Sequence, residues 1–404
     1  MILSTYNIVK KYTTGWTGEV TALDNVSINF PENKVVTLLG ETGSGKSTFS
    51  LICAALLKPD KGKVLYKVDD KILNEYENLL LGKDYEKADK LVKKFSVFDF
   101  PRKLLNDYRK SIGLMFQEAY QYLDDYLTVE QIIKEPILIN KLNVNIEEIE
   151  ESFGIKDIKD KYPFQLSDGQ KQKVALARAF SYAKDFIILD EPTSNLDPIS
   201  KREIIDTIKK YKATKTILLI THEANVAKEL SDYVYIIYRG QIIEKGPSSS
   251  IFSSPKHPYA KQLISIGLKS VAYSGIVGEE PYYPFKIKGC IYHRSCPFSF
   301  KDCGWTPEEV FYDLSNLYYI SRSKRLEGIA LNDENRIVLF NADVSEISSL
   351  ISSHKNKYRS FLAVESIQKT ESVVEIKIYP VQEIPLFEIG DIYTKCLLYR
   401  KIKT

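Results

Sequence analysis

One short glycine-rich run constrains this chain more than any other feature. Residues 40–48 read GETGSGKST and match the pattern G-x-x-x-x-G-K-[ST]. The apolar run Val35–Leu39 before it is typical of a buried parallel strand, and the apolar and small residues 49–57 after it are typical of a buried helix. Strand, glycine loop and helix together predict a loop whose backbone N–H groups bind phosphates, assisted by the positive end of the helix dipole.

The side chains of this run have separate expected roles. Lys46 is expected to reach the β- and γ-phosphates of a nucleotide, and Ser47 is expected to bind Mg²⁺. A chance match is expected in about one in a hundred chains of this length, and the strand–helix context lowers that figure. The predicted nucleotide-binding residues of the loop are Gly40, Glu41, Thr42, Gly43, Ser44, Gly45, Lys46, Ser47 and Thr48.

Length and composition restrict the class of protein. A chain of 404 residues predicts two or three domains, and 44% hydrophobic with 27% charged residues is typical of globular proteins. The net charge of +3 argues neither for nor against a nucleic-acid partner. No signal-peptide pattern opens the chain and no apolar run approaches the roughly 20 residues of a membrane helix, so we expect a cytosolic or peripherally docked protein.

The first half of the chain predicts strands, then helical insertions. We expect strands at 4–9, 20–23, 26–30 and Val35–Leu39, with the aromatic residues Tyr12 and Trp16 in the loop between the first two. An aromatic there either stacks on an adenine ring or packs as an ordinary side chain. Charged, helix-prone residues predict a solvated helical insertion at 69–110, and helical spacing predicts a helical subdomain at 118–165.

Polar residues follow three further apolar runs. Gln117 follows the run 112–116, Asp190 and Glu191 close the run 186–189, and His222 follows Thr221 after the run 216–220. Downstream of a phosphate-binding loop, Asp190 is expected to hold Mg²⁺ and Glu191 to polarise a water in line with the γ-phosphate. A lone histidine is usually structural, but the position of His222 favours a functional role.

In order along the chain, these motifs resemble those of the ABC-type ATPase family over residues 1–250. The resemblance implies an α/β fold with a RecA-like core, an antiparallel β subdomain and the helical subdomain 118–165. It implies that two such domains pair head to tail, with each ATP between the phosphate loop of one and the signature of the other. The matching segments are Walker A (40–47), the Q-loop residue Gln117, the signature (166–170), Walker B (186–191), the D-loop (194–197) and the H-loop residue His222.

The resemblance also assigns residues. Glu191 and His222 are implied as catalytic, with Ser47, Gln117 and Asp190 as Mg²⁺ ligands. Tyr12 is implied to stack on adenine, with Trp16 in reserve. One departure is Asp168, where the family usually has a second glycine; we expect binding to survive it. The residues implied to contact ATP held by the partner are Ser167, Gly169 and Gln170.

The C-terminal third narrows the resemblance. Residues 255–263, PKHPYAKQL, resemble the H-P-Y-T-x-x-L segment of oligopeptide and dipeptide importer ATPases. Cysteines follow with the spacing C-x5-C-x6-C, and a last one lies near the chain end; the family pattern places a [4Fe–4S] cluster on such a set. Spacing alone leaves a cluster, a zinc site and plain reduced cysteines open, although the C-x2-C pairs of structural zinc are absent. The implied ligands are Cys290, Cys296, Cys303 and Cys396.

Two features of this region depart from the family pattern. The family usually has an arginine immediately before the second cysteine, but in this chain the arginine, Arg294, stands one residue earlier. The segment between Cys303 and Cys396 is also longer than the family usually has. That segment predicts a small α/β unit, with strands at 336–340, 361–365 and 373–379 and a helix at 344–353. It is expected to be a structural or docking appendage, with a ligand-sensing domain as the alternative. Cys53 is expected to be a small core residue.

The expected domains are 1–250 for the ATPase, 251–283 for a connecting helix and linker, 284–309 with 385–404 for a small α+β cysteine module, and 310–384 for the insertion. The expected function is that of the ATP-hydrolysing subunit of an ABC importer of oligopeptides, dipeptides or oligosaccharides. The implied partners are a second ATPase subunit, as a homologous heterodimer rather than a homodimer, two transmembrane permease subunits and an extracytoplasmic solute-binding protein, on the cytoplasmic side of the plasma membrane. No nucleic-acid partner is expected.

Three rival functions are disfavoured. A translation-factor ABC ATPase normally carries two cassettes in one chain, whereas this chain has one. A repair ABC ATPase carries a long coiled coil, for which residues 69–110 and 118–165 are too short. A subunit that binds ATP without turnover is disfavoured by Glu191 and His222.

Overall fold

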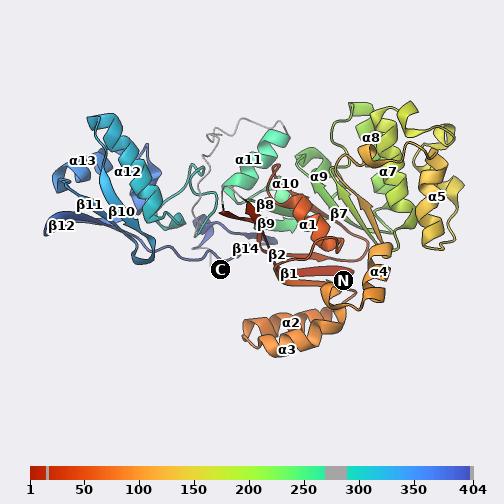
Figure 1. Ribbon diagram of the computed structural model, residues 1–404, viewed down its shortest axis with the longest axis horizontal. Coiled ribbons are helices and arrows are strands. Elements are labelled where there is room, and N and C mark those ends of the chain that lie inside the picture. The colour runs from red at the N-terminus through yellow and green to blue at the C-terminus, as the bar shows by residue number, and fades with distance from the viewer. Residues whose placement is uncertain (15–17, 269–288, 401–404) are drawn as a thin grey trace. The chain divides into compact units, whose positions relative to one another are not determined.

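The computed structural model describes residues 1–14, 18–268 and 289–400 (Figure 1). The chain forms two compact units, Met1–Ser254 and Pro255–Thr404. No helix among the described residues is long and apolar enough to cross a membrane. Trp16 lies outside the described residues.

The first unit is built around a mainly parallel sheet. Its strands lie in the order β9-β8-β3-β7-β6-β5, and only β9 runs antiparallel to its neighbour. Strands β3, β6 and β7 are buried along their whole length, which explains their unbroken apolar sequences. Because these three strands run parallel, their carboxyl ends meet at one edge of the sheet. The bounds are β3 (Val35–Leu39), β5 (Ile112–Met115), β6 (Phe186–Asp190), β7 (Thr216–Thr221), β8 (Tyr233–Tyr238) and β9 (Gln241–Pro247).

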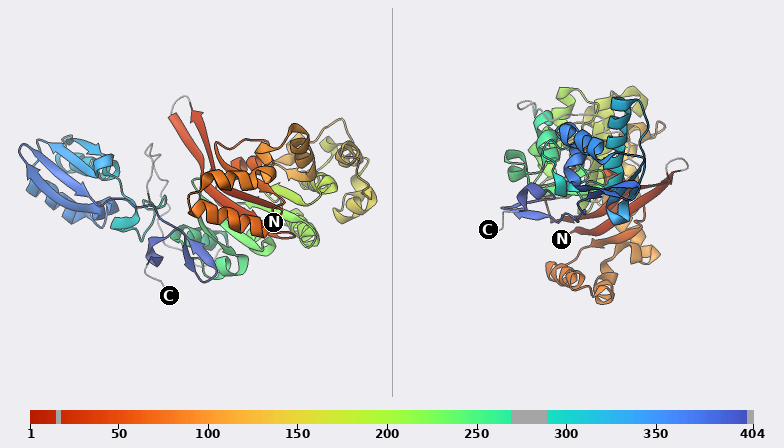
Figure 2. Two further views of the ribbon diagram at one scale, coloured as in Figure 1. Left: turned by 90° about the horizontal axis from the view of Figure 1, so that it is seen from below. Right: turned by 90° about the vertical axis from the view of Figure 1, so that its left-hand side faces the viewer.

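A second, antiparallel sheet in this unit has the order β2-β1-β4. The strands are β1 (Leu3–Thr14), β2 (Gly18–Phe30) and β4 (Lys61–Tyr66), and β1 and β2 continue past β4 as a two-stranded ribbon (Figure 2). The expected loop around Tyr12 was wrong, because Tyr12 lies on β1 opposite Val20. The strands expected at 20–23 and 26–30 are one strand, in which a register shift and the positive φ of Asn25 mark a bulge.

The two segments that were expected to be helical insertions contain helices in the structure (Figure 1). The segment 69–110 forms α2, α3 and α4, and 118–165 contains α5 and α6, whose apolar faces share a core with α7. Asp69 and Asp84 cap α2 and α3, and Thr128 forms a capping box on α5. The helices of this unit are α1 (Lys46–Cys53), α2 (Asp70–Leu81), α3 (Tyr85–Val92), α4 (Arg102–Ser111), α5 (Val129–Ile139), α6 (Ile146–Ser152), α7 (Asp168–Tyr182), α8 (Pro198–Tyr211), α9 (Ala224–Leu230) and α10 (Ser248–Ser253).

The second unit contains an antiparallel sheet of order β10-β11-β13-β12, with α12 and α13 on one face (Figure 1). Trp305, Phe361 and the inward residues of the strands form its core. A short hairpin, β14–β15, precedes Cys396. The bounds are α11 (Pro258–Gly267), α12 (Pro307–Arg322), β10 (Glu327–Leu331), β11 (Arg336–Phe340), α13 (Val344–His354), β12 (Val364–Thr370), β13 (Val373–Ile378), β14 (Phe387–Ile389) and β15 (Ile392–Thr394).

Several expected boundaries differ from these elements. The boundary at 309/310 falls inside α12, and that at 250/251 falls inside α10. Residues Arg359–Ala363 form a 3-10 turn, so the strand expected at 361–365 begins at Val364. Helix α12 and strand β10 were not predicted, although Thr306 and Glu309 form a capping box and Pro307 stands at the first helical position, both of which signal a helix start.

Candidate functional site

The glycine loop leaves β3 and enters α1 with a backbone that only glycine permits. At Gly45 φ is 102°, and an added Cβ would lie 2.4 Å from the Ala22 carbonyl oxygen. An added Cβ at Gly40 would lie 2.4 Å from the Ile237 carbonyl oxygen. Because the N-cap of α1 is Gly45, no side chain caps this helix start. Its N–H groups and positive dipole end therefore face the loop, as phosphate binding requires.

Lys46 lies across this loop. Its Nζ donates hydrogen bonds to the carbonyl oxygens of Gly40 at 2.9 Å and Glu41 at 2.8 Å. Burial lowers the pKa of Lys46, and the nearby carboxylates of Glu191 and Asp190 partly oppose that effect. A buried ammonium group at the centre of the loop is placed to attract an anion.

Asp190 ends β6, two strands from β3 in the sheet. Its side chain is 2% exposed, and burial raises its pKa to about 6, although a hydrogen bond from Ser47 opposes the rise. Ser50 of α1 lies 3.5 Å from Oδ2, whereas Oδ1 has no hydrogen-bond partner among the described residues. The structure therefore brings Asp190 beside the start of α1.

Glu191 follows with a left-handed backbone, φ 51°, which is uncommon for glutamate. Its side chain is buried and meets two residues from the end of β7. His222 Nδ1 lies 2.8 Å from Oε1, and the Thr221 hydroxyl donates to Oε2 at 3.3 Å. The ring of His222 is half-exposed, whereas Thr221 is fully buried. This carboxylate is thus held at the same sheet edge as the loop.

Tyr12 and Gln117, two further candidate nucleotide-binding residues, lie in different surroundings. Tyr12 is half-exposed, and its hydroxyl lies 3.5 Å from the Thr48 hydroxyl at the start of α1. Gln117 is exposed after β5, at the edge of the sheet next to β6, and makes no hydrogen bond to the described residues. Tyr12 is therefore near the glycine loop, whereas Gln117 lies exposed at the end of β5.

The signature lies at the start of α7. Ser167 and Gln170 form a capping box, in which Gln170 N–H donates to Ser167 Oγ at 3.3 Å and Ser167 N–H donates to Gln170 Oε1 at 3.1 Å. An added Cβ at Gly169 would lie 2.5 Å from Ser200 Oγ of α8. Among the described residues, no hydrogen bond or ion pair joins these signature residues to residues 40–48. The structure does not bring the signature together with its own glycine loop.

Two contributors to the site were missed in the sequence. Thr221 holds Glu191, and its oxygen also accepts the N–H of Glu223 at 3.0 Å. Glu223 in turn accepts from Thr193 at 2.8 Å and pairs with Lys201. Only the pairing of β6 with β7 reveals these contacts, since the residues are about 30 positions apart along the chain.

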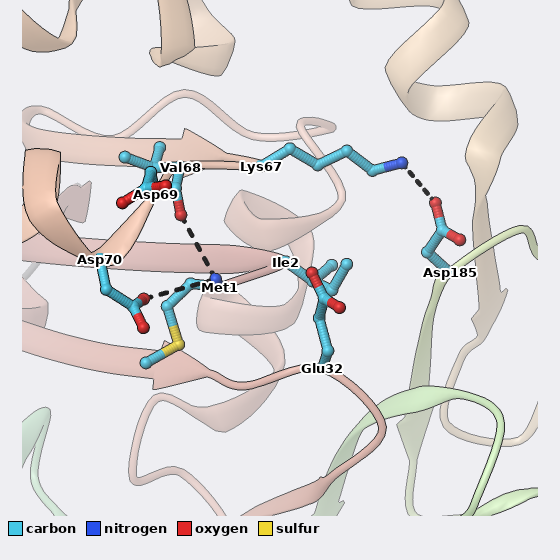
Figure 3. Close-up of a pocket in the computed structure, with 8 residues that line it drawn as sticks. All are labelled: Met1, Ile2, Glu32, Lys67, Val68, Asp69, Asp70 and Asp185. Carbon is cyan, nitrogen blue, oxygen red and sulfur yellow. Dashed lines mark hydrogen bonds and ion pairs between the residues drawn. The ribbon is translucent and has the colours of Figure 1, made fainter.

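A separate cavity of about 620 Å³ lies at the opposite edge of the sheet (Figure 3). Asp185 precedes β6 and Glu32 precedes β3, so the cavity faces the amino ends of the parallel strands. Two ion pairs lie within its lining: the Met1 amine pairs with Asp70 at 3.6 Å, and Lys67 pairs with Asp185 at 2.6 Å. It contains none of the predicted site residues.

In the second unit, the cysteine side chains gather. Cys290 N–H donates to the Cys303 carbonyl oxygen at 2.9 Å. Burial, with smaller contributions from the neighbouring thiols of Cys296 and Cys396, raises the pKa of Cys303 to about 12. Burial also raises the pKa of Cys290. Within the described residues, no three His, Cys, Asp or Glu side chains converge closely enough to hold a single metal ion. Cys53 is fully buried in α1, as expected.

Two family models match the chain: "ABC transporter" over residues 23–194, and "Oligopeptide/dipeptide transporter, C-terminal region" over residues 243–303. The putative oligopeptide transport ATP-binding protein YkfD of Bacillus subtilis is 30% identical over 303 residues, covering 70% of this chain and 84% of its own. The dipeptide transport ATP-binding protein DppF of Haemophilus influenzae is 29% identical over 309 residues, covering 73% and 86%.

A solved structure agrees with the fold of the first unit. The ATP-binding cassette MJ0796, in a dimeric post-hydrolysis state bound to ADP and Pi, aligns with a TM-score of 0.50 and 26% identity, covering 61% of this chain and 98% of its own. The expected ABC-type fold is confirmed. The chain therefore belongs to the ABC transporter family, as an ATP-hydrolysing importer subunit of the oligopeptide/dipeptide type.

Proposed function

We propose that Glu191 is the catalytic base of this ATPase and that His222 and Thr221 hold it in place. The observation that carries this proposal is the burial of Glu191 beside the glycine loop, with both carboxylate oxygens hydrogen-bonded. A carboxylate fixed in this way orients a water for attack on the γ-phosphate and accepts its proton. His222 remains half-exposed, so its ring is also accessible to the phosphate.

Residues 40–48 would cradle the phosphates, and Ser47, Gln117 and Asp190 would hold Mg²⁺. The unpartnered, buried Oδ1 of Asp190 fits a hard cation that prefers oxygen ligands. When bound, Mg²⁺ would neutralise part of the negative charge of the phosphates. Tyr12 would stack on the adenine ring, a role supported by its approach to Thr48, with Trp16 in reserve.

The signature residues Ser167, Gly169 and Gln170 would act on ATP held by a second ATPase subunit. Their separation from residues 40–48 within the chain supports this arrangement, as does the dimeric state of the similar cassette. We further propose a homologous heterodimer on the cytoplasmic side of the plasma membrane. It would work with two transmembrane permease subunits and an extracytoplasmic solute-binding protein, and import oligopeptides, dipeptides or oligosaccharides.

The test is the variant Glu191→Gln, which keeps size and hydrogen bonding but removes the base. Steady-state ATP hydrolysis by the purified transporter complex is expected to fall by about 10² to 10⁴-fold. ATP affinity is expected to be retained because the glycine loop is intact. The exposed carboxylate Glu148 provides a matched control: Glu148→Gln should leave turnover unchanged. Turnover of Glu191→Gln near that of the wild type rejects the assignment.

We propose that Cys290, Cys296, Cys303 and Cys396 ligate one [4Fe–4S] cluster within a module formed by residues 284–309 and 385–404. Their burial and mutual electrostatic influence support this donor set. A cubane cluster takes one thiolate at each iron and so spaces its ligands more widely than a single zinc ion does. Residues 310–384 would be an appendage between the third and fourth ligands. When bound, the cluster supplies a covalent cross-link between the chain end and residues 290–303.

Iron content tests this proposal. Protein purified without oxygen should be brown and contain about four iron atoms per chain. Cys396→Ser should lower the iron content and the melting temperature, because it opens a long loop. Cys53→Ala, in the other unit, is the control and should keep the iron. Stoichiometric zinc, or no metal after anaerobic preparation, would overturn the assignment.

A further inference from the structure

His257 lies directly against one of the cysteines. Its Nε2 is 3.7 Å from Cys290 Sγ, within hydrogen-bond range for sulfur. The side chain is 1% exposed and is the N-cap of α11. This histidine belongs to the His-Pro-Tyr segment, to which neither the ATPase site nor the proposed ligand set assigns a role.

The other ring nitrogen fixes the direction of this contact. Nδ1 accepts a hydrogen bond from the Tyr259 backbone N–H at 3.1 Å, so Nδ1 carries no proton. An imidazole ring whose Nδ1 is unprotonated carries its one proton on Nε2. The ring is therefore the donor and the sulfur is the acceptor.

We propose that His257 donates an N–H···S hydrogen bond to Cys290, which makes it a positioning residue for the cysteine site. The bond orients the Cys290 side chain and stabilises negative charge on its sulfur. Hydrogen bonds to ligating sulfurs tune the reduction potential of iron–sulfur clusters. Since a donor favours the more negative, reduced state, His257 raises the midpoint potential. This effect on potential rests on the proposed cluster, whereas the hydrogen bond does not.

The N-cap role and the donor role can be separated by substitution. In His257→Asn the short amide retains an oxygen that caps α11, but it does not extend as far as Nε2 of the ring. His257→Gln keeps a longer side chain with a terminal N–H donor. The cluster of His257→Asn is therefore expected to have a more negative midpoint potential than the wild type, with unchanged melting temperature and iron content. The potential of His257→Gln should return toward the wild-type value.

The potential is measured by redox titration of the full chain, followed by electron paramagnetic resonance. A wild-type potential in His257→Asn, at full iron content and melting temperature, overturns the proposal. A fall in melting temperature and iron with no change in potential also overturns it, because that pattern belongs to a structural cap alone.

A second measurement does not need the cluster. The chain has four histidines, so the ¹⁵N-histidine spectrum of the full chain is assignable by loss of one ring signal in His257→Asn. The inferred bond requires the Nε2–H tautomer for His257 in metal-free protein. An Nδ1–H tautomer overturns it. Absence of iron together with the Nε2–H tautomer rejects the cluster while supporting the hydrogen bond.

Discussion

At the scale of single residues, the proposed ATPase site contains a glutamate with a strained backbone. Glu191 adopts φ 51°, a conformation that costs energy for any residue with a Cβ, and the surrounding contacts maintain it. Its backbone N–H donates to Ile220 O at 2.9 Å, and its carbonyl oxygen accepts from the Ser194 hydroxyl at 3.0 Å. The side-chain bonds to His222 and Thr221 complete this support. The turn after β6 thus aims the carboxylate at the edge of the sheet.

Thr221→Val tests that support, since it removes the hydroxyl but keeps the shape. We expect kcat for ATP hydrolysis to fall about tenfold, because one hydrogen bond to a charged group of about 1.5 kcal/mol is lost. The dissociation constant for ATP should change little. Thr221→Ser retains the hydroxyl and should restore kcat. A kcat equal to that of the wild type in Thr221→Val, measured by a coupled ATPase assay, contradicts the positioning role.

At the scale of elements, α12 is joined to the cysteine loop by buried charges. His293, fully buried, has Nε2 3.0 Å from Glu309 Oε1 and Nδ1 2.6 Å from the Cys290 carbonyl oxygen. Arg294 lies 3.5 Å from Glu309 and 3.4 Å from Asp313 of the same helix. Burial raises the pKa of Glu309, but the hydrogen bond and the electrostatic attraction from His293 outweigh this effect. The net pKa of Glu309 is therefore lowered. These contacts attach α12 to the loop that contains Cys290.

Glu309→Ala is expected to destabilise the second unit by about 3–5 kcal/mol, because it leaves Arg294 and His293 without their buried carboxylate. Thermal unfolding of the full chain, followed separately for the two units, measures this loss. The exposed Glu327 of β10 is the control, and Glu327→Ala should have a small effect. If the two variants unfold at the same temperature, the network is not a stabilising feature of this unit.

At the scale of the whole molecule, the chain holds one glycine loop and one signature, and among the residues that the structure describes no hydrogen bond or ion pair joins the two. The signature caps its own helix and packs beside α8, so its Ser167 is exposed at a surface. In the arrangement proposed above, a second ATPase subunit would face this surface and complete two composite sites, so a single cassette would need a partner for turnover.

A mixed dimer tests the trans arrangement. When this chain carries Ser167→Ala and its partner subunit carries alanine in place of the lysine of its own glycine loop, one composite site has both defects and the other has neither. With independent sites, ATP hydrolysis is expected to be about half that of the wild-type dimer. Dimers with the same single variant in both chains are the controls and should be inactive. If the mixed dimer is as inactive as these controls, Ser167 does not act on the partner's ATP.

The motifs were readable in the sequence because each is local. A glycine loop between a buried strand and a helix is specified by adjacent residues, so residues 40–48 and the carboxylates after β6 were predicted with their neighbours. The Thr306–Glu309 capping box is equally local and could have indicated the start of α12, although that helix was not predicted. For such features, backbone conformation and chemistry are set by the same few residues.

The tertiary structure alone decided which local pieces meet. Thr221 supports Glu191 because β7 pairs with β6, and sheet order depends on the packing of the whole unit. Tyr12 approaches Thr48 because it lies on a strand, a placement set by its cross-strand partner Val20. His257 meets Cys290 across 33 residues, for which no periodicity exists in the sequence. Contacts between distant residues follow from burial of a shared core, which a linear pattern does not encode.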